Sequence, residues 1–290
     1  MAYLLWSSSG QLREFVPKSP YWLAIASMSI ILSLALNGVL FYLFLNSARN
    51  DAPVSLSVVF RLHFVGQVLR YLPGRLWGIV YQVGSAKGAV SKGRLARANI
   101  DWMFFSLAAN SLAAISIVLS RFHLSVFQLA LFIGSGWVVV AAFFLGGADF
   151  FLDRFSRILP SRVSAVLSVL AGEPLSLRYF LLACIVFLFS WGGYIIGWQL
   201  LSKVFPVLEG CNMLFICAAY TLASVVGILS VITPAGLGVR EASFVAFAGA
   251  IAPPPVVAFF AVFGRVWLMA IDLLLCVLSI VIFRRRVEEK

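Results

Sequence analysis

The sequence predicts an all-α polytopic integral membrane protein, and three observations carry that prediction. Of 290 residues, 62% are hydrophobic and only 11% are charged, whereas a soluble domain carries roughly 25% charged residues. The mean hydropathy is +1.02, and apolar runs long enough to cross a bilayer recur along the chain. The 26 phenylalanines and eight tryptophans are typical of lipid-facing and interfacial positions. We therefore expect one transmembrane domain over residues 1–290.

About eight membrane segments are expected, because a crossing helix needs about 20 mostly apolar residues. Two of them are irregular. Segment 55–83 carries three arginines and a Pro-Gly break, and segment 236–252 is short and opens on glycines and charges. The sequence leaves open whether these two cross the membrane or turn back as re-entrant hairpins. The other six are continuous apolar runs, at residues 21–45, 100–120, 126–146, 177–200, 211–233 and 255–283.

Lysine and arginine are unevenly distributed among the predicted loops. If both irregular segments cross, thirteen basic residues lie on the side of the termini and three, Arg49, Arg121 and Lys203, on the other. By the positive-inside rule we expect a multi-pass protein of the cytoplasmic (inner) membrane with both termini cytoplasmic. The net charge of +11 then reflects loops against anionic headgroups, and nucleic acid is not an expected partner. The thirteen are Arg13, Lys18, Lys87, Lys92, Arg94, Arg97, Arg154, Arg157, Arg162, Arg284, Arg285, Arg286 and Lys290.

Sequence motifs for cofactors, metals and catalytic nucleophiles are not found, so no cofactor or metal is expected. The four cysteines fall in or beside apolar runs without CxxC or Cys/His spacing, which is typical of small packing residues. Gly193 and Gly197 form a GxxxG pattern that predicts close helix packing.

The two irregular segments can be laid over each other. Gly66 is followed seven residues later by Pro73, and Gly227 is followed at the same interval by Pro234. Proline ends the helix before it, and the glycines that follow each proline permit close backbone approaches. Apolar segments interrupted by Pro and Gly at corresponding places in two halves are typical of transporter sites built on inverted repeats. We therefore expect an inverted repeat with a substrate site at the breaks.

Charged residues flank both breaks. A guanidinium pairs bidentately with phosphate, and a helix that starts after Gly238 directs its positive end toward an anion. Neighbouring positions point about 100° apart, so Arg240 and Glu241 are not expected to pair with each other. The expected substrate-binding residues are Arg70, Pro73, Gly74, Arg75, Pro234, Gly236, Gly238, Arg240 and Glu241.

Three further charged residues are expected to support this site. Arg265 and Asp272 are seven residues apart on the last predicted helix, share a face, and are expected to pair with each other. Arg61 lies nine residues before Arg70, on the opposite side of an ideal helix. Intramembrane charges are expensive and face the bundle interior.

The stretches YLPGRLWG and TPAGLGVREASF resemble the lysylphosphatidylglycerol synthase transmembrane-region family. The motif Pro-x-Gly-x-Gly-x-x-Glu is matched by Pro234, Gly236, Gly238 and Glu241, and the resemblance covers roughly 21–283. It implies a stand-alone bacterial membrane domain without the family's aminoacyl-transferase domain. It also implies movement of an anionic phospholipid or a polyprenyl-phosphate-linked lipid between leaflets, in the cell envelope.

The expected function is therefore a lipid translocase that is not an enzyme, with a membrane lipid as its partner. Two alternatives stay open. A membrane-embedded lipid transferase would need a catalytic carboxylate or a metal near the cytoplasmic face. A non-catalytic subunit would instead scaffold a glycosyltransferase or another protein of cell-envelope biosynthesis.

Overall fold

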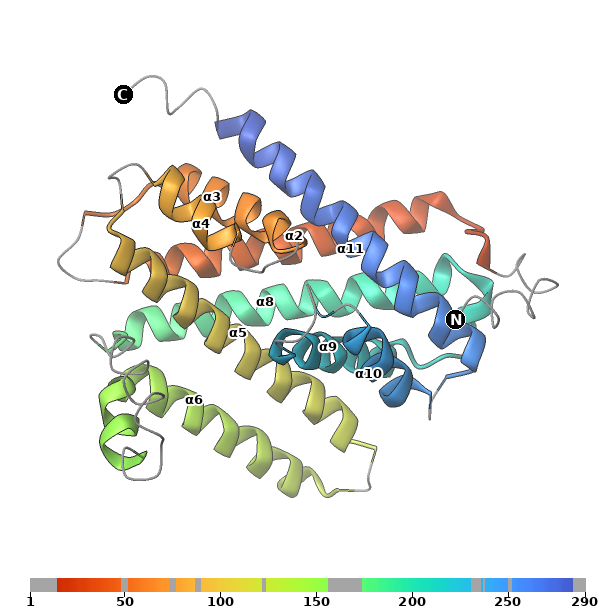
Figure 1. Ribbon diagram of the computed structural model, residues 1–290. Helices are drawn as coiled ribbons and strands as arrows, with labels where there is room; N and C mark the ends of the chain where they lie inside the picture. Colours follow the sequence, from red (N-terminus) through yellow and green to blue (C-terminus); the bar gives the residue numbers. More distant parts are fainter. Residues whose placement is uncertain are drawn as a thin grey trace.

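The fold was analysed in a computed structural model, in which every regular element of the described residues is a helix (Figure 1). The described residues are 15–47, 52–72, 77–86, 90–121, 124–155, 174–230, 236, 238–249 and 252–283. The prediction of an all-α polytopic membrane protein is confirmed.

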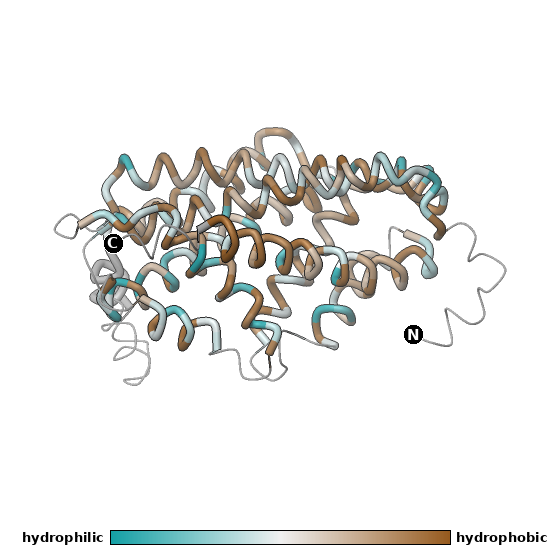
Figure 2. Tube along the Cα trace, turned by 90° about the horizontal axis from the view of Figure 1, so that it is seen from above, coloured by the Kyte–Doolittle hydropathy of each residue, from teal (hydrophilic) through white to brown (hydrophobic). Residues whose placement is uncertain are grey.

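Five helices in the described part of the chain are long and apolar enough to cross a membrane. They are apolar along most of their length (Figure 2). Helix α5 begins at Lys92 rather than near residue 100, because the Ser91 side chain caps it by accepting from the Arg94 N–H. Helix α6 continues past the predicted end at 146. The five are α2 (Pro20–Leu45), α5 (Lys92–Leu119), α6 (Val126–Phe155), α8 (Leu177–Leu200) and α11 (Pro254–Phe283).

Helices α2 and α8 pack against each other along the centre of the bundle (Figure 1). A Cβ added at Gly197 would lie 2.6 Å from Ile30 Cδ1, and one at Gly193 would lie 3.3 Å from the Ser29 carbonyl oxygen. The GxxxG pattern therefore packs α8 on α2, as predicted. The buried Ser190 hydroxyl donates to the Ser33 carbonyl at 2.9 Å, which satisfies a polar group in the apolar interior.

The two irregular segments each form a pair of short helices that pack against each other. The first pair is α3 (Leu56–Leu69) and α4 (Trp77–Ser85), and the second is α9 (Met213–Leu229) and α10 (Val239–Ala248). At 1.5 Å per residue, even the 17 residues of α9 span only about 25 Å, less than the hydrocarbon thickness of about 30 Å. Both segments therefore turn back as hairpins. Two 3₁₀ turns, η2 (Leu201–Lys203) and η3 (Pro206–Leu208), lead from α8 into the second hairpin.

The two halves of the chain repeat one order of elements in opposite directions. The first half is α2, the α3–α4 hairpin and α5, and the second is α8, the α9–α10 hairpin and α11; α6 lies between them. In Figure 1, α2 and α11 run from right to left, whereas α5 and α8 run from left to right. Helix α3 of the first hairpin packs on α11, and helix α9 of the second hairpin packs on α5. This reciprocal packing is the arrangement of an inverted repeat.

Contacts near the helix ends show which connections share an end of the bundle. At one end, the Lys18 N–H donates to the Val204 carbonyl at 2.9 Å. At that end too, the Arg121 guanidinium lies 4.7 Å from the centre of the Phe215 ring. At the other end, Arg94 Nε donates to the Leu45 carbonyl at 2.8 Å. The start of α2 and the end of α11 lie at opposite ends (Figure 1), so the eight crossings that would place both termini on one side are not formed.

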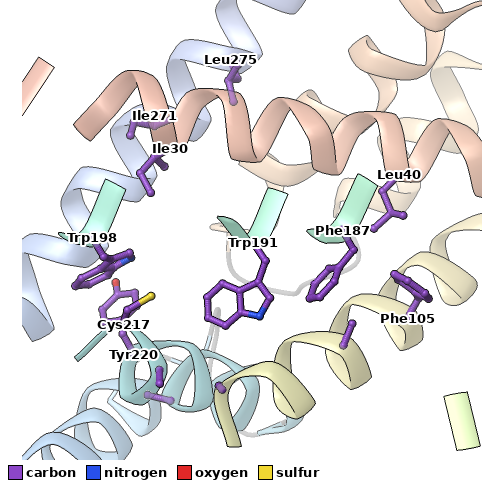
Figure 3. Packing of buried hydrophobic residues seen from close by; sticks show 14 of the residues in the cluster. Ile30, Leu40, Phe105, Phe187, Trp191, Trp198, Cys217, Tyr220, Ile271 and Leu275 are labelled. Carbon is purple, nitrogen blue, oxygen red and sulfur yellow. The ribbon is translucent and has the colours of Figure 1, made fainter. Parts of the chain in front are cut away.

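An aromatic core fills the space between α8 and its neighbours. Trp198 of α8 lies 4.8 Å from Tyr220 of α9, centroid to centroid, and about three turns earlier on α8 Phe187 lies 6.1 Å from Phe105 of α5 (Figure 3). Trp198 is fully buried. These rings hold the second hairpin at a fixed depth beside α8.

Candidate functional site

Each hairpin closes on a contact between two glycines. A Cβ added at Gly78 of α4 would lie 2.6 Å from the Gly66 carbonyl oxygen of α3. In the second hairpin, a Cβ at Gly236 would lie 2.8 Å from Gly227 Cα, and Gly236 has φ +70°. Gly66 and Gly227 are the glycines that the sequence comparison aligned. They take the same place in both hairpins, which supports the predicted repeat.

The first break is tied to α11 through Asp272. Arg70 Nη2 donates to Asp272 Oδ2 at 3.1 Å, and the Tyr71 hydroxyl donates to the same oxygen at 2.6 Å. The Asp272 side chain is 6% exposed and that of Arg70 is 46% exposed. The carboxylate is therefore compensated by one guanidinium and one hydroxyl, both from the end of α3.

The second break is tied to α11 through Glu241. Glu241 Oε2 accepts from the Gly238 N–H at 2.8 Å, which caps the start of α10 in the manner of an acidic residue at the third helical position. Its other oxygen, Oε1, accepts from Arg265 Nη1. The two side chains are largely buried. Glu241 thus shapes the break and compensates a charge on α11.

The predicted pairing of Arg265 with Asp272 is wrong. The two do belong to one face of α11, but each binds a different hairpin: Arg265 binds Glu241, and Asp272 binds Arg70. The prediction failed because residues seven apart lie about 10 Å from each other along a helix axis, while each hairpin brings a partner within bonding distance. Helix α11 therefore connects the two breaks.

Among the described cations at the breaks, Arg240 is the one that lacks a carboxylate. Its guanidinium lies 4.4 Å from the centre of the Tyr220 ring, and its Nε is buried without a hydrogen-bond partner. The ion pairs among the described residues do not include it, so it does not pair with Glu241, as predicted. The residue as a whole is partly exposed, but a buried guanidinium nitrogen without a partner is unfavourable in a low-dielectric interior.

Two neutral hydrogen-bond donors, in the adjacent rings of Trp198 and Tyr220, are also unsatisfied. The Tyr220 hydroxyl and Trp198 Nε1 are buried without partners, and the residues are 1% and 0% exposed. Tyr220 is held in place against α11, where a Cβ at Gly264 would lie 2.9 Å from Tyr220 Cε2. Buried polar groups without partners are rare in native proteins and indicate a water, an ion or a ligand group that completes them.

The two breaks approach each other inside the bundle. Tyr220 lies within electrostatic range of Tyr71 from the first break and of Arg240, Glu241 and Arg265 around the second. In Figure 1 the hairpins enter from opposite ends of the bundle. Helix α11 links them, because its Asp272 binds Arg70 of the first break and its Arg265 binds Glu241 of the second.

Comparisons with family models, with curated proteins and with solved structures found no match to this chain. The resemblance to the lysylphosphatidylglycerol synthase transmembrane-region family stays a prediction from the two motifs.

The predicted site residues fall into three sets. Arg70, Gly236, Gly238, Arg240, Glu241, Arg265 and Asp272 lie at the breaks or bind them. Pro73, Gly74, Arg75 and Pro234 lie outside the described residues. Arg61 is partly buried in α3, nine residues before Arg70, and none of the ion pairs of the described residues involves it.

Sequence reasoning missed the aromatic members of the site, Tyr71, Tyr220 and Trp198. Tyr71 adjoins Arg70, and a hydroxyl beside a predicted site arginine was the signal that could have found it. Tyr220 and Trp198 stand in continuous apolar runs, where aromatic residues are common packing residues. Only the arrangement of α8, α9 and α10 shows that their polar atoms lack partners.

Proposed function

We propose that this protein binds the phosphate of an anionic membrane lipid at the second break and moves that lipid between the two leaflets. Non-helical backbone at membrane depth is tolerated where it is buried in protein or lines a cavity. Paired helix breaks in inverted repeats are the usual place of transporter sites. The lipid is an anionic phospholipid or a polyprenyl-phosphate-linked lipid.

The observation that carries the proposal is the uncompensated charge of Arg240. Its guanidinium covers the ring of Tyr220, whose hydroxyl is unsatisfied. Arg240 also stands at the start of α10, where the first N–H groups of a helix have no partner within the helix. Arginine forms strong, charge-assisted hydrogen bonds with phosphate oxygens. A phosphate here would neutralise the cation and accept from the donors around it.

The hairpins also change the proposed orientation. With both hairpins turned back, we propose that the end of α11 is cytoplasmic and the start of α2 is on the opposite face of the inner membrane. The side of the α11 end then holds twelve basic residues in connections or in the end turns of helices, and the opposite side holds four, which keeps the positive-inside bias. The four are Arg13, Lys18, Arg121 and Lys203. The twelve are Arg49, Lys87, Lys92, Arg94, Arg97, Arg154, Arg157, Arg162, Arg284, Arg285, Arg286 and Lys290.

Lipid movement by purified protein in vesicles tests this proposal. Fluorescent phosphatidylglycerol is placed in one leaflet, and its arrival in the other is followed by quenching with a membrane-impermeant reductant. We expect Arg240→Gln to slow transport at least tenfold and Arg240→Lys, which keeps the charge, to slow it less.

Arg121→Gln is a matched control. Arg121 also lies over an aromatic ring of α9, Phe215, at 4.7 Å, but it is exposed at the end of the bundle, away from the breaks. It should leave transport unchanged. Equal transport by wild type and Arg240→Gln would overturn the site. A stoichiometric glycosyltransferase partner together with no lipid movement would favour the scaffolding alternative.

A further inference from the structure

Among the described residues, the charges at the two breaks leave one positive charge over. The described residues there are three guanidinium groups, from Arg70, Arg240 and Arg265, and two carboxylates, from Glu241 and Asp272. Asp272 pairs with Arg70, and Glu241 pairs with Arg265. Of these three described cations, Arg240 keeps an uncompensated charge.

The carboxylates are not free to turn toward Arg240. Both oxygens of Glu241 are in use, because Oε1 binds Arg265 and Oε2 binds the Gly238 N–H. Asp272 Oδ2 already accepts from both Arg70 and Tyr71. Freeing Glu241 would leave the largely buried Arg265 without its counterion, which is strongly unfavourable, and freeing Asp272 would break its bonds to both Arg70 and Tyr71. The leftover charge is therefore built into the site.

The neighbours of Arg240 supply donors but no charge. Trp198 Nε1 can only donate, and the Tyr220 ring that the Arg240 guanidinium covers carries a hydroxyl without a partner. These groups favour a ligand rich in acceptor oxygens. They do not compensate a second negative charge in an apolar surrounding.

We propose that the lipid bound here is a phosphodiester with one net negative charge. This inference rests on the proposed function and narrows its substrate. A phosphodiester carries one charge at neutral pH, whereas a phosphomonoester carries about 1.5 to 2. One phosphodiester would neutralise Arg240, and a monoester or diphosphate would bring unpaired charge into the bundle. Both glycerophospholipids and sugars linked to a polyprenyl monophosphate contain this group.

Lipid binding to the purified full chain tests the charge class. Binding is measured by native mass spectrometry in competition at pH 8, with three probes: phosphatidylglycerol, a diester; phosphatidic acid, a monoester; and phosphatidylcholine, a diester with no net charge. We expect phosphatidylglycerol to bind about tenfold better than either of the others, which corresponds to about 1.4 kcal/mol. A fourth probe, a polyprenyl monophosphoryl sugar, is also a phosphodiester. Its binding relative to that of phosphatidylglycerol shows whether the site prefers a polyprenyl-linked lipid or a glycerophospholipid.

Acidification gives an internal check on the same protein. The second pKa of a phosphomonoester is about 6, so phosphatidic acid changes toward one charge as the pH falls from 8 to 5. Its binding relative to phosphatidylglycerol should rise several-fold over that range. A constant ratio would argue against charge as the basis of selection.

A charge variant should reverse the preference. Glu241→Gln keeps the acceptor that caps α10 but leaves Arg265 as well as Arg240 uncompensated, so phosphatidic acid should bind better than phosphatidylglycerol. The matched control is Asp101→Asn, which removes a carboxylate paired with Arg97 at 3.3 Å within α5 and should leave the ratio as in wild type.

The inference is overturned if wild type prefers phosphatidic acid at pH 8, or if Glu241→Gln leaves the ratio unchanged while retaining lipid. Its failure is distinct from that of the proposed function. If the protein prefers and transports a monoester lipid, the proposed function stands and the inference of a singly charged diester is wrong. If the protein binds phosphatidylglycerol selectively but does not move it, the inference of a singly charged diester stands and the proposed transport is wrong.

Discussion

At the scale of single residues, the hairpins depend on glycines that permit backbone contact. Gly78 is buried at the start of α4 and faces the Gly66 carbonyl, whereas Gly84, six residues later on the same helix, has nothing within 4 Å of an added Cβ. Alanine substitution at Gly78 therefore tests the close backbone contact, whereas alanine substitution at Gly84 tests only the change in helix propensity.

Gly78→Ala should lower stability, and Gly84→Ala should not. The added carbon at residue 78 would lie 2.6 Å from a backbone oxygen, and overpacking of this kind is destabilising by about 1–3 kcal/mol. At residue 84, the gain in helix propensity is up to about 1 kcal/mol. Thermal unfolding of the purified variants in one detergent measures both. A similar midpoint for the two variants would contradict the glycine contact.

At the scale of elements, α11 holds both hairpins through two side chains of one face. Asp272 binds the end of α3, and Arg265 binds the start of α10. A ligand that attracted Arg265 or Arg70 away from its carboxylate would loosen one hairpin and leave the other in place. The two attachments can therefore be broken separately.

Asp272→Asn should increase hydrogen exchange in α3 and α4, and Arg265→Gln should increase it in α10. Hydrogen bonds to charged groups are worth about 1.5–3 kcal/mol, and the value for Asp272 belongs near the lower end because Arg70 is 46% exposed. If the lost attachment contributes about 1.4 kcal/mol to the free energy of local opening, exchange in the affected hairpin should become about tenfold faster. Equal effects of each variant on both hairpins would show that α11 does not hold them independently.

The positions of the breaks could be predicted from sequence, but the partners at the breaks could not. Pro73, Pro234 and the glycines mark where a helix must stop, and their alignment located Gly66 and Gly227. The partner of Arg265 depends on how α10 lies across α11, which no spacing along α11 encodes. The same holds for Tyr220 and Trp198, whose polar atoms are unsatisfied only because α8, α9 and α10 bury them together.

At the scale of the whole molecule, the hairpins determine at which end of the bundle each half of the chain begins and finishes. Because each turns back, the first half ends at the side where it began, and the second half repeats it upside down. The Lys18 to Val204 contact groups the start of α2 with the end of α8, and Arg94 groups the start of α5 with the end of α2. Two inverted halves give two hairpins that enter the bundle from opposite ends (Figure 1), which a lipid site reached from both leaflets would require.

Cysteine labelling in intact cells distinguishes this topology from eight crossings. With Cys184, Cys211, Cys217 and Cys276 replaced by alanine, single cysteines are placed at Val16, Lys92 and Arg121, which are exposed in the structure. A membrane-impermeant maleimide should label positions 16 and 121 from outside, and position 92 only after permeabilisation. Eight crossings with cytoplasmic termini would instead protect positions 16 and 92 together and leave 121 labelled. Position 16 therefore decides between the two, because the hairpins alone determine on which face the chain begins.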